Sequence, residues 1–167
     1  MFSPATRHFL RLLLIALSLM ATGAGPPHGQ QDLRGKITID KLYTAFPVFR
    51  TGADAYRPEP DAVQELSRIN LDTKIVAFLG TWCLDSRSEI PALLKTLTLS
   101  RNRHIFLELI AVDRGIDDGT GDVDRLKVFS VPTIIVFRNN REIGRIRGLA
   151  RESMESDILH ILVSSPP

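Results

Sequence analysis

Apolar residues along the chain follow two patterns, continuous runs and runs at helical spacing. Continuous runs at residues 74–80 and 104–113 are typical of strands buried on both faces of a sheet. A third strand is predicted at 133–138, and Asn139-Asn140 turns it into a fourth at 142–148. Asparagine tolerates the positive φ angles of a two-residue hairpin turn, so the last two strands are expected to be antiparallel.

Helical spacing of apolar residues predicts helices between and after these strands. The longest covers residues 83–99, with a kink expected where Pro91 removes a backbone donor. A short helix is predicted at 122–129 and an amphipathic helix at 151–163. Ahead of the first long strand, a helix at 61–70 is expected to be capped by its first residue, an aspartate.

The N-terminal third carries weaker patterns. Residues 25–35 are rich in Gly, Pro and Gln and are expected to form a flexible leader. Alternation of isoleucine with polar residues predicts a short strand at 36–40, and residues 51–60, with two prolines and a glycine, are predicted to be a loop.

The order of strand, helix, strand, helix, hairpin and helix predicts an α/β fold with a central mixed β-sheet flanked by helices. Parallel neighbours need helical crossovers, whereas a two-residue turn joins antiparallel strands. The length is sufficient for one domain over residues 36–167, with its core elements in about 60–163.

The first 24 residues have the features of a secretory signal peptide. Arg7 and Arg11 precede an apolar stretch at residues 12–20, and small residues follow at 21–24. The sequence therefore predicts an exported, periplasmic or secreted protein. The alternative is an uncleaved membrane anchor, for which the apolar stretch is shorter than the ~20 residues that span a bilayer.

Charge and cysteine content narrow the classes of partner. Removing residues 1–24 takes away two arginines and no acid, which leaves 19 basic and 19 acidic residues, so the composition gives no case for nucleic acid as a partner. The chain has one cysteine, Cys83, which cannot form an internal disulfide. Cys83 therefore stays free, links two copies into a homodimer, or is used chemically.

The position of Cys83 favours a chemical use over that of a buried apolar filler. It follows the apolar run 74–80 and begins the predicted helix, where free backbone N–H groups and the helix dipole stabilise a thiolate. The Asp85 carboxylate opposes that effect and Arg87 offsets part of it. Asp85 is equally well explained as an acid that interacts with the helix dipole.

The residues Trp82-Cys83-Leu84-Asp85-Ser86 resemble the WCxxC redox motif of the thioredoxin-like superfamily, with serine in place of the second cysteine. Val131-Pro132-Thr133 before a hairpin fits the same pattern. The longer stretch WCLDSRSEIP resembles the WCxxCRxExP of exported TlpA and ResA proteins. This resemblance implies a thioredoxin-like three-layer fold in which Pro132 is cis and lies against the cysteine. Ala77 departs from it, because thioredoxins carry a buried aspartate there.

The resemblance also implies roles for the residues of the site. Cys83 would be the nucleophile, Ser86 would donate a hydrogen bond to its sulfur, and Glu89 would relay protons near the thiol. The alternatives are a neutral replacement at Ser86 and a surface carboxylate at Glu89. Trp82 is expected to be a partly exposed lid or a packing residue, and Val131 and Pro132 to present the substrate.

The predicted function is thiol-disulfide exchange through Cys83 with protein or low-molecular-weight thiols and disulfides. Mixed-disulfide formation, isomerisation, deglutathionylation and reduction of a sulfenic acid are each open to one thiol. An external reductant is needed to recycle Cys83, because Ser86 cannot resolve a mixed disulfide. The alternative is a non-catalytic binding module with a thioredoxin fold. No cofactor or metal is expected, since the histidines are unpaired and the aspartates of residues 113–124 lack the EF-hand order.

Overall fold

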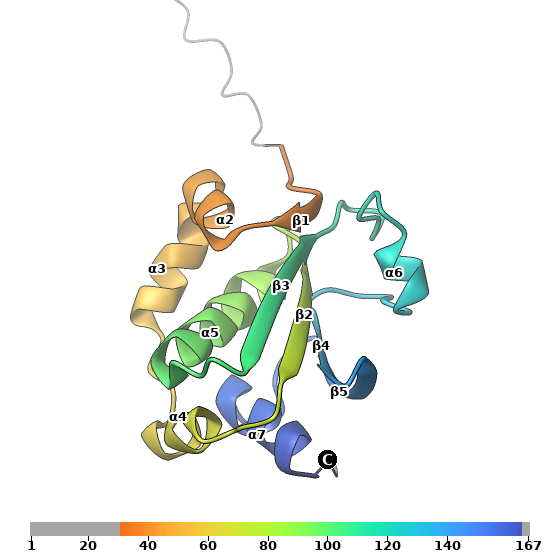
Figure 1. The fold of residues 1–167 in the computed structure, drawn as a ribbon. Coiled ribbons are helices and arrows are strands. Elements are labelled where there is room, and N and C mark those ends of the chain that lie inside the picture. Colours follow the sequence, from red (N-terminus) through yellow and green to blue (C-terminus); the bar gives the residue numbers. More distant parts are fainter. Residues whose placement is uncertain (1–30, 165–167) are drawn as a thin grey trace, which may run out of the picture. The chain divides into compact units, whose positions relative to one another are not determined.

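The computed structural model describes residues 31–164, which form a five-stranded sheet flanked by helices (Figure 1). The predicted signal peptide and the leader up to residue 30 lie outside the described residues. In the sheet, whose order is β1-β3-β2-β4-β5, only the β2–β3 pair is parallel. The strands are β1 Gly35–Ile37, β2 Thr73–Leu79, β3 Ile105–Ala111, β4 Thr133–Arg138 and β5 Arg141–Arg147.

Of the six helices within residues 31–164, five cover one face of this sheet and a four-residue helix lies on the other (Figure 1). The helices are α2 Ile39–Ala45, α3 Pro47–Ala55, α4 Pro60–Ser67, α5 Leu84–Ser100, α6 Asp122–Arg125 and α7 Met154–Ser164. The mixed sheet and its flanking helices confirm the predicted α/β class. None of the helices within residues 31–164 is long and apolar enough to cross a membrane.

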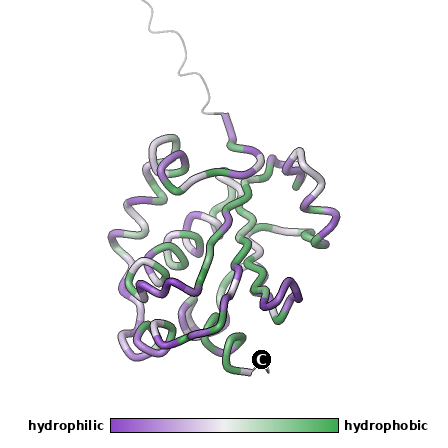
Figure 2. The backbone as a smooth tube through the Cα atoms, in the orientation of Figure 1, coloured by the Kyte–Doolittle hydropathy of each residue, from purple (hydrophilic) through white to green (hydrophobic). Residues whose placement is uncertain are grey.

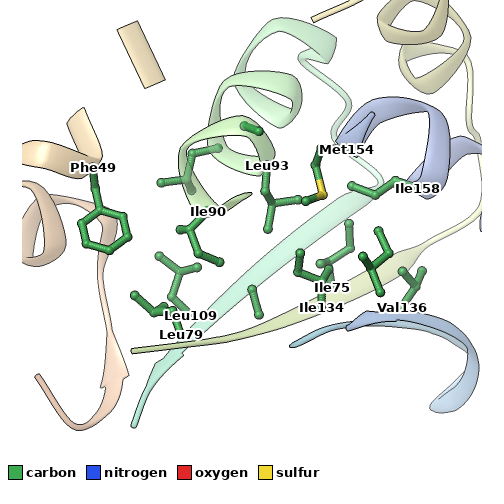
Figure 3. Close-up of a cluster of buried hydrophobic side chains, with 14 of the residues drawn as sticks. Phe49, Ile75, Leu79, Ile90, Leu93, Leu109, Ile134, Val136, Met154 and Ile158 are labelled. Carbon is green, nitrogen blue, oxygen red and sulfur yellow. The ribbon is translucent and has the colours of Figure 1, made fainter. Parts of the chain in front are cut away.

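The larger core lies between the sheet and the helices α2 to α5 and α7. Leu93 of α5 and Phe49 of α3 are fully buried in this core, and Leu93 faces the strand that carries Ile134 (Figure 3). Burying a leucine, isoleucine or phenylalanine side chain stabilises a fold by ~1.5–3 kcal/mol. Figure 2 shows the same division along the backbone, with hydrophobic residues concentrated in the central strands and hydrophilic residues frequent on the outer helices.

A smaller core fills the opposite face of the sheet. Phe78 and Ile110 are buried there against Val128 and Val131, which belong to the segment that connects β3 to β4. Trp82 and Cys83 pack against the edge of this cluster. The smaller core therefore fixes the segment before Pro132 beside the end of β2, where the cysteine is located.

The C-terminal half follows the predictions closely. The strand predicted at 133–138 has those bounds, and the hairpin turn has φ angles of 51° and 61° at Asn139 and Asn140. The helix predicted at 122–129 is shorter, because α6 ends at Arg125 and Lys127 adopts a positive φ of 53°.

The N-terminal region differs more from the predictions. Residues 51–55 were predicted to be loop but belong to α3, which begins at Pro47 and buries Phe49 and Ala53 on one side. Glu59, rather than Asp61, is the N-cap of α4, because a proline at the first helical position has no N–H that needs a partner. That helix ends at Ser67 instead of residue 70.

Candidate functional site

Cys83 is the N-cap residue of the 17-residue helix α5. Its backbone is extended, and its N–H donates to the Gly80 carbonyl at 3.0 Å. The thiol is half-buried, and Sγ donates a hydrogen bond to the Val131 carbonyl at 3.2 Å. This bond requires the protonated thiol, because a thiolate has no hydrogen to donate.

Two further loops lie beside the loop that carries the thiol. The Val131–Pro132 peptide bond is cis, and the Pro132 carbonyl accepts the Gly148 N–H at 2.8 Å. Gly148 follows β5 directly and has a positive φ of 68°, a conformation that glycine adopts without strain. The structure thus brings Cys83, Val131 and Pro132 together from segments that lie 48 residues apart.

Ser86 does not make the predicted contact with sulfur. Its side chain is fully buried, and Oγ accepts the Gly80 N–H at 3.2 Å. Among the described residues no hydrogen bond joins Ser86 to Cys83, and the thiol donates to Val131 instead. The physical reason is that the backbone before the helix folds back over its first turn and offers an amide to the buried hydroxyl.

Glu89 is directed to another loop. Its Oε2 accepts the Ala150 N–H at 3.1 Å, and its Oε1 accepts the Ser88 hydroxyl at 3.3 Å. The predicted proton relay beside the thiol is not seen, because the carboxylate is held by the loop between β5 and α7. Glu89 thereby stabilises the loop that contains Gly148.

Trp82 is half-buried and is held on several sides. Its Nε1 donates to the Val112 carbonyl at 3.3 Å, and the Arg114 guanidinium carbon lies 5.6 Å from the ring centroid, within cation–π range. The indole covers Gly80, where an added Cβ atom would lie 2.7 Å from Cε2 of the ring. Trp82 therefore combines the two predicted roles of partial exposure and packing.

Substituting Gly80→Ala should displace this indole, because a methyl group cannot share the space that the ring occupies. Trp82 is the only tryptophan of the chain, so its fluorescence reports the change directly. We expect stronger acrylamide quenching and red-shifted emission, with a loss of stability of about 1–3 kcal/mol from overpacking. Unchanged quenching would contradict the close packing of Trp82 on Gly80.

Sequence reasoning missed the contacts that hold the residue before Trp82. Thr81 is fully buried, and its hydroxyl donates to Asp32 Oδ1 at 3.0 Å. Its carbonyl accepts two bonds from Arg87, Nε at 3.0 Å and Nη2 at 2.8 Å. Asp32 also forms an ion pair with Arg114, Oδ2 to Nε at 3.3 Å. Asp32 belongs to the segment predicted to be a flexible leader, and no local pattern marks it.

Three large apolar side chains are exposed on the segments that carry Cys83, Val131 and Gly148, and sequence reasoning missed them as well. Leu84 is 77% exposed, Phe129 83% and Leu149 59%. Leu84 follows the cysteine, Phe129 lies two residues before Val131, and Leu149 follows Gly148. Each of these side chains is therefore available to a partner that binds near these loops.

The acidic loop after β3 is organised by its own backbone. Asp113 Oδ1 accepts the N–H groups of Gly115 and Asp117. Arg34 forms ion pairs with the carboxylates of Asp113 and Asp117. The hydrogen bond from Arg34 lowers the pKa of Asp117. Within residues 31–164, no group of three or more His, Cys, Asp or Glu side chains is arranged to hold a metal ion.

Comparison with solved structures gives matches over most of the chain at low identity. A protein of unknown function from Pseudomonas aeruginosa is 18% identical, with a TM-score of 0.56 over 76% of this chain and 87% of that one. An HIV epitope-scaffold is 18% identical, with a TM-score of 0.57 over 77% and 88%. Thioredoxin O2 from Arabidopsis thaliana is 20% identical, with a TM-score of 0.43 over 62% and 83%.

Neither the protein-family models nor the curated proteins give a match to this sequence. At these identities the structural likeness concerns the fold alone. The chain has the predicted thioredoxin-like fold, because the strand order, the long helix after β2 and the closing antiparallel hairpin with its final helix are all present.

Proposed function

We propose that this chain is an exported, single-cysteine thioredoxin-like protein that exchanges disulfides through Cys83. The observation that carries the proposal is the position of Sγ at the start of α5, half exposed and 3.2 Å from the carbonyl before the cis-proline. A helix N-terminus stabilises the thiolate that attacks a disulfide. An inert structural cysteine would gain nothing from this placement.

The exchange step balances without a cofactor. The Cys83 thiol loses its proton to solvent, and the thiolate attacks one sulfur of a substrate disulfide. A bond forms between Cys83 and that sulfur, the substrate S–S bond breaks, and the second sulfur leaves as a thiolate that takes up a proton. The product is a mixed disulfide between the chain and its substrate.

Release of the mixed disulfide needs a second thiol from outside the chain, because Ser86 has no sulfur. In isomerisation a cysteine of the same substrate attacks, so no net reductant is consumed. In deglutathionylation or sulfenic acid reduction, an external thiol frees Cys83 and is itself oxidised. These outcomes share one attacking residue and differ only in the partner.

The surroundings of the thiol favour a polypeptide as one partner. The exposed side chains of Leu84, Phe129 and Leu149 offer apolar contacts on the segments that carry Cys83, Val131 and Gly148. An extended substrate segment can pair with the backbone of Val131, as the resemblance to thioredoxin-like proteins implies. The WCLDSRSEIP stretch and the apolar segment at residues 12–20 support the exported TlpA/ResA-like branch and a periplasmic or secreted location.

A second candidate function is that of a binding module that has lost redox turnover. The hydrogen bond from Sγ to the Val131 carbonyl favours it, because that bond engages the thiol as a donor within the fold. In this function the exposed side chains of Leu84, Phe129 and Leu149 bind a partner, and the thiol is a packing group.

Intact-mass analysis separates these functions. Incubated with oxidised glutathione, the wild-type chain should gain a glutathione adduct that reductant removes, and Cys83→Ser should gain none. The matched control is Cys83→Ser/Ser88→Cys, which has an exposed thiol on the same helix outside the N-cap position. We expect its adduct to form about tenfold more slowly.

Equal rates for Cys83 and the control thiol would contradict the proposal, and a bare thiol in protein recovered from its own compartment would favour the binding module. A reductant-sensitive dimer would instead assign Cys83 a structural role between two copies.

A further inference from the structure

We infer that Asp32 is a positioning residue for Cys83, acting through Thr81 and Arg114 on the two residues that precede the thiol. This inference rests on the proposed function. Asp32 lies ahead of β1, 49 residues before Thr81, and its side chain is 25% exposed. It touches none of the reacting atoms, so its effect passes through the loop at residues 80–83.

The first route from Asp32 runs through Thr81. The buried hydroxyl donates to Asp32 Oδ1, while Arg87 holds the carbonyl of the same residue with two hydrogen bonds. The hydroxyl and the carbonyl of Thr81 are therefore held by two different residues, Asp32 and Arg87. A buried hydroxyl without a partner costs ~1–3 kcal/mol, which is sufficient to shift a short loop toward another conformation.

The second route runs through Arg114 to Trp82. Asp32 Oδ2 faces Arg114 Nε at 3.3 Å, and the guanidinium of Arg114 lies over the indole. The side chain of Arg114 is 72% exposed, so packing restrains it little and we expect the ion pair with Asp32 to orient it over the ring. One carboxylate thus orients Thr81 directly and Trp82 indirectly, and Cys83 follows them in the chain.

A neighbouring contact provides the control. Arg34 attaches the same N-terminal segment to the acidic loop through Asp113 and Asp117, and makes no contact with Thr81 or Trp82 among its described interactions. Removing Arg34 therefore loosens the segment without removing the two contacts of Asp32. The pair of substitutions Asp32→Ala and Arg34→Ala separates positioning of the thiol from general attachment of the segment.

The effect on exchange follows from geometry. Disulfide exchange needs the attacking sulfur aligned with the bond that breaks, and a misplacement of ~1 Å can cost up to ~100-fold in rate. Loss of Asp32 leaves the hydrogen bonds of Arg87 in place, so we expect a partial effect, about tenfold. Asp32→Asn keeps an acceptor for the Thr81 hydroxyl and should recover most of the rate.

The test measures three properties of the full chain and of its Asp32→Ala, Asp32→Asn and Arg34→Ala variants. These are the rate of adduct formation with oxidised glutathione, the acrylamide quenching of Trp82, and the unfolding temperature. We expect Asp32→Ala to be about tenfold slower and more strongly quenched, Asp32→Asn to lie close to wild type, and Arg34→Ala to stay within about twofold.

The inference is overturned if Asp32→Ala matches the wild type in rate and quenching, or if Arg34→Ala is slowed equally. It is also overturned if the lower rate of Asp32→Ala is fully explained by loss of folded chain, as judged from its unfolding temperature. A wild-type chain that forms no adduct refutes the proposed function instead. In that case the quenching of Trp82 in Asp32→Ala still decides whether Asp32 positions the loop.

Discussion

The Ser86→Cys variant should reduce insulin disulfides catalytically with dithiothreitol, at about ten times the uncatalysed rate or more, whereas the wild-type chain should give no repeated turnover. Ser86 lies one helical turn after Cys83 and is fully buried. A cysteine there would attack the mixed disulfide, free the substrate as a thiol and leave an internal disulfide for the reductant. The measurement is the turbidity of precipitating insulin chains over time.

The matched control for this prediction is Ser88→Cys, which adds a thiol on the same helix. Ser88 is exposed and lies five residues after Cys83, so its side chain points to a different side of α5. We expect no catalysis from it. If Ser86→Cys forms the internal disulfide on oxidation but does not turn over, the site around Cys83 no longer supports disulfide exchange. The binding module then becomes the better function.

The Glu155→Ala variant should lose about 3 kcal/mol of unfolding free energy, enough to lower the melting temperature by roughly 10 °C. Glu155 is the second residue of α7 and is 1% exposed. Its carboxylate accepts the Tyr56 hydroxyl at 2.8 Å, the Glu59 N–H at 2.9 Å and the Thr96 hydroxyl at 3.3 Å. Removing the carboxylate leaves all three donors without that partner. The network that is lost joins α7 to α5 and to the segment between α3 and α4.

The same network predicts how stability depends on pH. Burial raises the pKa of Glu155, but hydrogen bonds from Glu59 and other donors outweigh burial, so the pKa lies below its ordinary value of 4.5. Burial and Glu155 raise the pKa of Tyr56 above 10. The Glu155 contribution is therefore full above about pH 4.5 and lost as pH falls through the folded pKa, and that of Tyr56 is lost as pH rises above 10.

Chemical denaturation of the wild type and of Glu155→Gln across this range checks the assignment. The acid-side fall in stability should be smaller in Glu155→Gln, because glutamine has no proton to gain. Tyr56→Phe is the companion variant, since it removes one donor and leaves the carboxylate in place. A Glu155→Gln variant with the same acid-side slope as the wild type would show that other carboxylates dominate acid unfolding.

Several parts of the site could be read from local sequence. The apolar run at 74–80, the helix start at Cys83 and the hairpin at Asn139-Asn140 depend on the residues themselves and their immediate neighbours, because strand burial, capping and turn geometry are short-range properties. The motif around Cys83 placed the cysteine after β2 and at the start of α5, where the structure has it. The helix α3 was missed, because its burial depends on packing against α5.

The partners of the site residues were decided only by the tertiary structure. Glu89 finds the amide of Ala150 across 61 residues, Thr81 finds Asp32 across 49, and Tyr56 finds Glu155 across 99. No spacing in the sequence encodes such contacts, since they arise when folding brings distant segments together. The sequence by itself determined where the thiol lies and which helix it begins, whereas the fold determined which groups hold it there.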